Sequence, residues 1–270
     1  MDNNMEFGIC TGYSDKEGEA NIYKNGNVSV FDIVSTIYGG YRGGVYRNSV
    51  VLERDKLVEA LNNFKGYKTN ILQLKGDMAE FYHAGTFNIN AAQRGSRHRV
   101  FVDRSHGLGS ADISGNFDKD FGLKYYKDGG HTAKQQAKSI KEAYEKYKGN
   151  GGTDSIKEYL EKNGYKAVDE NAPLYEGQIR IVPKEQLEDV KKWLERKIAE
   201  ESLKRPEQVK RYQETLNMLD DRLRDGKNAS LPLTNEEAKE IARIAKEGGI
   251  DSKILELTDE EIIRMKYVVT

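Results

Sequence analysis

A helix followed by three short β-prone runs, between residues 70 and 126, constrains the fold of this chain most strongly. Asn70 is a suitable N-cap, and apolar residues then recur at helical spacing: Ile71, Leu74, Met78 and Phe81 or Tyr82. Residues 97–102 are β-prone, and residues 110–114 and 121–126 have the pattern of a hairpin. Because a helix with one apolar face must bury it against another element, the segment predicts a mixed α/β (α+β) core.

The flanking sequence predicts further elements of both kinds. They are helices at 53–64, 132–148, 155–162 and 184–203, and a strand at 178–182. Pro206 opens another helix, whose apolar stripe is predicted to include Leu219 and Leu223. Capping boxes at 234–237 and 258–261 predict two more helices. The C-terminal region is therefore predicted to be helical.

Three segments follow from these patterns. Residues 1–66 hold a predicted hairpin at 20–31, a Gly- and Tyr-rich stretch at 38–47 and a helix. Residues 67–200 hold the α/β core, and residues 201–270 hold the C-terminal helices, which carry apolar stripes and many opposite charges four residues apart. Such helices suit packing on the core, on a protein partner or on a second copy of the chain.

Charge is unevenly distributed along the 270 residues, although the formal net charge is only −1. Residues 67–150 contain 14 basic and 9 acidic residues, whereas the segments on either side are net acidic. A locally basic segment in a nearly neutral protein fits a phosphate-bearing partner, and it also fits an ordinary solvated surface.

Several classes of protein and of site are disfavoured. Cys10 is the only cysteine, so an internal disulfide and a cysteine metal cluster are excluded and a reducing, cytoplasmic setting is expected. The acidic N-terminus lacks a secretory pattern, no apolar run approaches the ~20 residues of a membrane span, and no membrane partner is expected. Phosphate-loop, dinucleotide-binding and serine-hydrolase motifs are missing from the sequence.

The predicted hairpin carries the strongest candidates for chemistry. Asp112 follows a run of small residues at the start of one strand, and Lys124 lies on the partner strand. Glu80 projects from the preceding helix. Phosphodiester hydrolysis at neutral pH needs a cation, and Mg²⁺ is commonly held by one or two carboxylates. We therefore expect Asp112 and Glu80 to hold Mg²⁺ and Lys124 to stabilise negative charge in the transition state.

Other polar residues of the basic segment supply supporting roles. His83 lies three residues after Glu80, so both project from about the same side of the helix, and His83 is expected to orient water or phosphate. Four cationic residues are the candidates for binding the nucleic-acid backbone: Arg97, Arg99, Arg104 and Lys134.

The order of Glu80, then Gly109-Ser-Ala-Asp112, then Leu123-Lys124-Tyr-Tyr, resembles the PD-(D/E)xK nuclease superfamily. The resemblance covers roughly residues 70–200 and implies a restriction-endonuclease-like core that cleaves DNA with Mg²⁺. In the family pattern the residue two positions before the lysine is acidic, or sometimes glutamine. In this chain that residue is Gly122, so the chain departs from the pattern there. Four nearby residues are candidates to replace the missing acid: Glu80, Asp120, Gln135 and Gln136.

Two alternatives remain open at this point. The same fold without catalysis would bind nucleic acid through the basic segment or a protein through the C-terminal helices, and Gly122 favours that possibility. All four histidines fall within residues 83–131, so a metal-independent, histidine-based RNase is the second alternative. It would use His83, His98 and His106 with Asp103 or Asp112.

Overall fold

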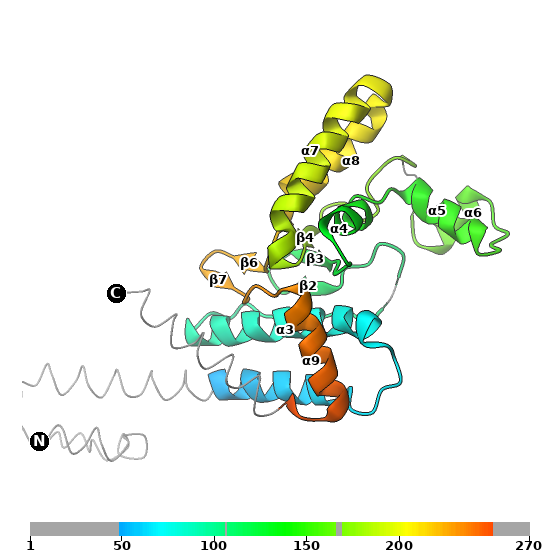
Figure 1. Ribbon diagram of the computed structural model, residues 1–270. Helices are drawn as coiled ribbons and strands as arrows, with labels where there is room; N and C mark the ends of the chain where they lie inside the picture. The colour runs from blue at the N-terminus through cyan, green and yellow to red at the C-terminus, as the bar shows by residue number, and fades with distance from the viewer. Residues whose placement is uncertain (1–48, 106, 166–168, 251–270) are drawn as a thin grey trace, which may run out of the picture.

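A five-stranded mixed sheet lies at the centre of the computed structural model, which describes residues 49–105, 107–165 and 169–250 (Figure 1). The strands lie side by side in chain order: β1 (Val100–Val102), β2 (Ile113–Gly115), β3 (Asp120–Leu123), β4 (Ile179–Ile181) and β5 (Leu219–Asp220). The first three strands pair antiparallel, whereas β3, β4 and β5 pair parallel. The predicted mixed α/β class is confirmed.

Helix α3 (Ile71–Gln93) is longer than its apolar repeat alone indicates. Asn70 caps it as predicted, because its side chain accepts a hydrogen bond from the Leu72 backbone N–H at 2.8 Å. The segment from residue 84 onward, which is ambiguous in the sequence, continues the helix and buries Phe87 completely. The helix ends before Gly95, whose positive φ suits a chain reversal that glycine adopts without strain.

Helix α3, the helical residues 49–62 and α9 (Asn235–Glu247) cover one face of the sheet (Figure 1). Their apolar side chains form one core with the inward residues of the strands, including Phe121, which is fully buried. This core includes Leu61 and Ile241. The described parts of the predicted segments 1–66, 67–200 and 201–270 therefore share a single core.

Three helices lie on the other face of the sheet: α4 (Gly129–Gln136), α7 (Leu187–Lys204) and α8 (Val209–Asn217) (Figure 1). Two 3₁₀ turns, η2 (Lys184–Gln186) and η3 (Pro206–Gln208), lead into α7 and α8. A second apolar cluster joins these helices to the sheet through Val182, which follows β4. The sheet is thus covered by helices on both faces.

The helix predicted at 132–148 is two helices, α4 and α5 (Ile140–Gly149). The helix is interrupted before Ser139. This residue caps α5 through a reciprocal capping box with Glu142, and its backbone forms an isolated β-bridge with Pro173. Helices α5 and α6 (Ile156–Lys162) have an apolar cluster of their own and extend away from the sheet (Figure 1). We call this pair the helical arm.

The predicted helix after Pro206 is also too long. In the structure α8 ends at Asn217, and Leu219 belongs to β5 at the edge of the sheet. A small hairpin follows, made of β6 (Arg224–Asp225) and β7 (Asn228–Ala229) around Gly226, whose φ is +56°. Residues 201–250 are therefore not purely helical. The Asp225-Gly226 dipeptide favours the tight turn of this hairpin.

Some predictions fall on residues outside the described ranges: the hairpin at 20–31, the stretch at 38–47 and the capping box at 258–261. Within the described ranges, no helix combines the length and the apolar character that crossing a membrane requires.

The buried face of α3 gives a direct test of this packing. Leu74 is completely buried, whereas Leu72, on the same helix, is 61% exposed. We expect Leu74→Ala to lower the free energy of unfolding by about 2–5 kcal/mol, because it opens a cavity in the core. Leu72→Ala, the matched control, should change it by less than about 0.5 kcal/mol. Urea unfolding measures both, and equal losses would contradict the described packing.

Candidate functional site

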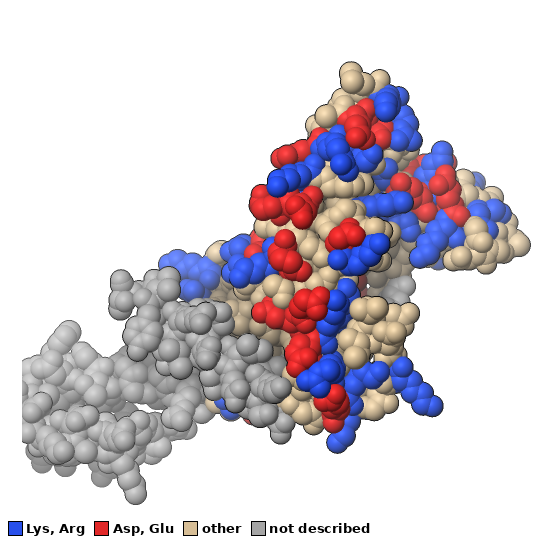
Figure 2. Space-filling view, viewed as in Figure 1, with Lys and Arg blue, Asp and Glu red and all other residues tan. Residues whose placement is uncertain are grey.

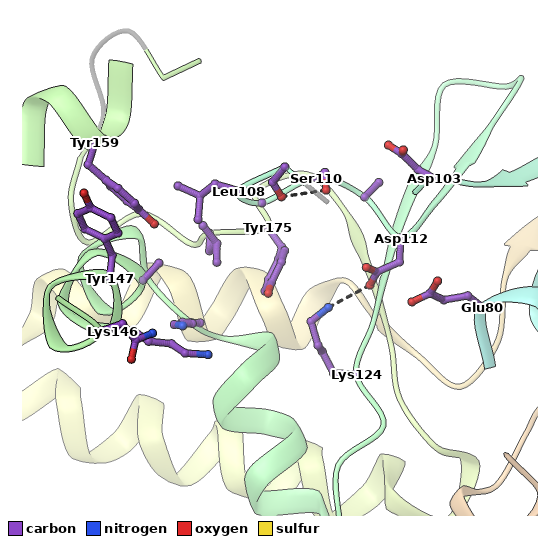
Figure 3. A pocket seen from close by; sticks show the side chains of 17 residues that line it. Glu80, Asp103, Leu108, Ser110, Asp112, Lys124, Lys146, Tyr147, Tyr159 and Tyr175 are labelled. Atoms are coloured by element: carbon purple, nitrogen blue, oxygen red, sulfur yellow. Dashed lines mark hydrogen bonds and ion pairs between the residues drawn. The ribbon is translucent and has the colours of Figure 1, made fainter. Parts of the chain in front are cut away.

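A pocket of about 430 Å³ lies between the strand ends and the helical arm (Figure 3). Its polar lining includes three carboxylates, three ammonium groups and three tyrosines: Glu80, Asp103 and Asp112; Lys124, Lys138 and Lys146; Tyr147, Tyr159 and Tyr175. In Figure 3 the labelled carboxylates lie on one side, Lys146, Tyr147 and Tyr159 on the other, and Tyr175 between them.

Asp112 and Lys124 are in direct contact, with the Lys124 Nζ 3.0 Å from Asp112 Oδ2 (Figure 3). The same oxygen accepts a hydrogen bond of 2.6 Å from the Leu123 backbone N–H. Alternation along the strands explains this placement, because Ile113 and Phe121 point into the core and their neighbours point away from it. The hairpin therefore fixes the Asp112 carboxylate in one orientation.

Lys124 is held in its charged form. Burial lowers the pKa of its ammonium group, but Tyr175 and Asp112 outweigh that effect, and the pKa is raised above its usual value. The ammonium also lies 4.7 Å from the centre of the Tyr175 ring, where a cation is attracted by the aromatic face. Lys124 thus places a permanent positive charge at the pocket wall.

Glu80 lies on α3 and faces the same part of the pocket as Asp112 (Figure 3). Its pKa is raised to about 8, first by burial and then by the negative charges of Asp112 and Asp77. The Arg104 guanidinium, 3.7 Å from the Glu80 carboxylate, offsets this only in part. A bound cation would favour the ionised form and reverse the shift, since opposite charge lowers the pKa of a carboxyl group.

The donor set at the site can be compared with the needs of a metal. Within the described residues, no group of three histidine, cysteine, aspartate or glutamate side chains is arranged to hold a metal ion. Mg²⁺ keeps several waters and commonly takes only one or two carboxylates from the protein. Asp112 and Glu80 fit that smaller requirement.

Gly122 stands at the position where the PD-(D/E)xK pattern has an acidic residue, and the Gln178 side chain fills the space beside it. A Cβ added there would lie 2.8 Å from the Gln178 side-chain oxygen. Gln178 is fixed by a 2.7 Å hydrogen bond from its Nε2 to the Gly109 carbonyl oxygen. An acid at position 122 would collide with this amide unless Gln178 moved, so glycine and Gln178 fit together.

The four candidate replacements for that acid lie in different places. Glu80 lines the pocket, whereas Asp120 is exposed at the start of β3 and Gln135 lies on α4; neither of these two lines it. Gln136 is buried, and its Nε2 donates to the backbone carbonyls of Gly122 and Ile181 at 2.9 Å each. Gln136 therefore holds β3 and β4 together.

The expected role of His83 must be corrected, because its ring is fully buried on the core side of α3. Its Nδ1 lies 2.9 Å from the Ser230 hydroxyl and its Nε2 lies 2.8 Å from the Tyr125 hydroxyl. Burial lowers the pKa of His83 to about 3, so the ring is neutral. His83 is a structural residue and does not reach the pocket.

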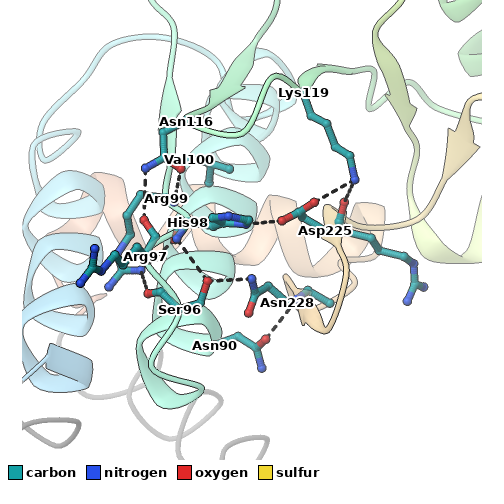
Figure 4. Close-up of polar contacts among 12 residues, drawn as sticks. Asn90, Ser96, Arg97, His98, Arg99, Val100, Asn116, Lys119, Asp225 and Asn228 are labelled. Atoms are coloured by element: carbon teal, nitrogen blue, oxygen red, sulfur yellow. Dashed lines mark hydrogen bonds and ion pairs between the residues drawn. The ribbon is translucent and has the colours of Figure 1, made fainter.

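The other two histidines that the structure describes, His98 and His131, have separate partners. His98 pairs with Asp225 and stacks on Phe117 at 5.0 Å (Figure 4). His131 contacts Asp128, the N-cap of its own helix, and neither His98 nor His131 lines the pocket. His106 lies outside the described residues. Histidines that are close in sequence are separated here because they belong to different elements.

The predicted phosphate-binding residues are also dispersed. Arg104 approaches the site through contacts with Asp77 at 2.6 Å and with Glu80. Arg99 contacts Glu53 and nearby backbone carbonyls, Arg97 is exposed beside it (Figure 4), and Lys134 lines a second pocket. On the face shown in Figure 2, basic and acidic side chains are interspersed.

Five residues line the pocket that the sequence patterns do not assign to the site: Lys138, Lys146, Tyr147, Tyr159 and Tyr175. In a continuous helix over 132–148, Lys138 would flank the apolar stripe and Tyr147 would belong to that stripe. The break at Ser139 lets the chain turn and brings the helical arm over the strand ends. The signal for that break is present in the sequence as the capping-box pattern Ser139-x-x-Glu142.

Comparison with known proteins finds no matching family model, no matching curated protein and no matching solved structure. The chemistry of the pocket must therefore be argued from its own residues.

The raised pKa of Glu80 predicts a specific pH dependence of stability. The unfolded group ionises near 4.5 and the folded group near 8, so folding disfavours the charged form and stability falls as pH rises between these values. In the absence of metal at pH 8.5, we expect the free energy of unfolding of Glu80→Gln, measured in urea, to exceed that of the wild type by at least about 1 kcal/mol.

The difference should shrink to a few tenths of a kcal/mol near pH 4.5 and disappear below that pH, where Glu80 is protonated in the folded and the unfolded states alike. Glu59→Gln, which replaces an exposed glutamate, is the control and should show no such pH-dependent gain. A Glu80→Gln variant that is equally destabilised at both pH values would contradict the described electrostatics.

Proposed function

We propose that this protein is a Mg²⁺-dependent nuclease that hydrolyses phosphodiester bonds of DNA through a PD-(D/E)xK-like site. The supporting observation is the contact between Asp112 and Lys124, with Glu80 facing the same pocket. A carboxylate pair, a charged lysine and an open pocket are the groups that metal-assisted phosphodiester hydrolysis needs.

In the proposed reaction, Asp112 and Glu80 hold the cation. Bound Mg²⁺ supplies polarisation of the phosphate and activation of the attacking water. Lys124 neutralises the negative charge that develops on the phosphate oxygens, and its fixed position means that little reorganisation is needed. The contact with Asp112 and the ring of Tyr175 hold that ammonium in place.

Glu80 has a second use in this scheme. A carboxyl group whose pKa lies near 8 takes up a proton readily near neutral pH. When no cation is bound to it, Glu80 is therefore mostly protonated at neutral pH and is suited to donate a hydrogen bond to a water molecule, while its ionised fraction can accept a proton.

The second candidate is a catalytically inactive nucleic-acid-binding or protein-binding module of the same fold. Gly122 and the Gln178 amide beside it favour this candidate, because the position that supplies a ligand in the family has no side chain here. The histidine-based RNase has less support, since the described histidines lie apart.

Asp112→Asn tests the proposed function. We expect it to lower Mg²⁺-dependent cleavage of single-stranded, linear and plasmid DNA by at least about 100-fold on whichever of them the wild type cleaves, because it removes a metal ligand and the partner of Lys124. Circular dichroism should show that the fold is retained. Asp55→Asn, which replaces an exposed aspartate, should keep full activity. Cleavage by Asp112→Asn at the wild-type rate would refute the assignment.

Metal binding separates the nuclease from the inactive module. If Mg²⁺ binds the folded chain and not the unfolded chain, it should raise the Tm by mass action. This rise in Tm should be lost in Asp112→Asn. Differential scanning fluorimetry with and without Mg²⁺ measures this shift. A Tm that does not respond to Mg²⁺, together with no DNA cleavage, would favour the inactive module.

A further inference from the structure

The pocket continues beyond the proposed reaction centre to a second group of polar residues on the helical arm. Lys138, just before α5, and Lys146, on α5, both line it. In the described part of the chain, neither ammonium group has a hydrogen bond or an ion pair with another side chain. Glu142 is the one acid whose charge favours the charged form of Lys138, and no carboxylate of the described residues pairs directly with either ammonium group, which leaves a place for an anion.

The positive charges of Lys138 and Lys146 repel each other. The pKa of Lys138 is lowered, first by burial and then by the positive charge of Lys146. An anion between the two ammonium groups would relieve this repulsion, since opposite charge favours the charged form of lysine. A phosphate next to the scissile phosphate has the required charge.

The wall beside the lysines is aromatic. The rings of Tyr147 and Tyr159 pack with their centres 4.8 Å apart, and both residues line the pocket. The Tyr147 hydroxyl is fixed by a 2.7 Å hydrogen bond to Asp154. Aromatic side chains combined with basic groups are the usual means of holding single-stranded nucleic acid, where bases have free faces.

The size of the pocket limits the substrate further. A volume of about 430 Å³ lies near the lower end of the range for small-molecule pockets. The bases of duplex DNA are paired and stacked, so a nucleotide of a duplex must leave the stack before it can enter such a pocket. An unpaired nucleotide with its flanking phosphates is a substrate of suitable dimensions and charge.

We propose that the pocket takes an unpaired strand of nucleic acid, with Lys138 and Lys146 binding a phosphate that neighbours the one at Asp112 and Lys124. The nucleotide lies against the tyrosine wall between these two positions. This inference rests on the proposed nuclease function for the identity of the reaction centre. The binding of the strand itself depends only on the lysines and the tyrosines.

Binding in EDTA tests the inference without cleavage. The probe is a short fluorescein-labelled oligothymidylate, compared with a dA·dT duplex closed by loops at both ends, and fluorescence anisotropy reports affinity. We expect the full chain to bind the single strand at least tenfold more tightly. The double variant Lys138→Gln/Lys146→Gln should lose about tenfold or more of that affinity. The slope of log affinity against log salt concentration should become shallower by about 0.7, the value for one phosphate contact.

The matched control is Lys141→Gln/Lys157→Gln, which removes two exposed lysines of the same helical arm that do not line this pocket. It should bind within about twofold of the wild type and separate a specific subsite from general charge. Equal affinity for the closed duplex, or unchanged binding by Lys138→Gln/Lys146→Gln, would overturn the inference.

Cleavage of the same two DNAs with Mg²⁺ distinguishes this inference from the proposed function. Strand binding that depends on Lys138 and Lys146, without any cleavage by the wild type, supports the strand pocket and contradicts the nuclease. Cleavage of the closed duplex without a preference for the single strand supports the nuclease and overturns the strand pocket.

Discussion

The contact between the Asp112 carboxylate and the Lys124 ammonium is the interaction on which the proposed chemistry depends. It joins two paired strands at the point where their polar faces meet the pocket. The carboxylate is further fixed by the Leu123 backbone, and the ammonium by Tyr175. Because both groups are partly buried, solvent screens their charges less than it would at an open surface.

The sheet can support this site because its two faces differ. Ile113 and Phe121 pack on α3 and its neighbours, whereas Asp112 and Lys124 point to the other side. The core therefore fixes the strand positions without using the side chains of the candidate site. Glu80 completes the arrangement from α3, and burial near Asp112 gives it a high affinity for a proton that a cation would displace.

Local patterns predicted much of this arrangement, and long-range contacts account for the rest. The cap at Asn70 placed Glu80 on the correct helix. The predicted strands at 110–114 and 121–126 are shorter in the structure, so that Asp112 directly precedes β2 and Lys124 directly follows β3. His83 was misplaced because a helical wheel shows which residues share a face, but not which face the core covers. The core is completed by α9, whose contact with α3 is distant in sequence. Likewise, only tertiary packing makes Leu219 an edge strand.

The central claim is that Asp112 and Glu80 together hold a divalent cation beside Lys124. The most direct measurement is anomalous diffraction from crystals of the full chain soaked in Mn²⁺, which takes the same hard oxygen ligands as Mg²⁺ and scatters more strongly. We expect an anomalous peak within coordination distance of both carboxylates, and no peak there in Asp112→Asn. A soaked crystal without a peak at these carboxylates would contradict it.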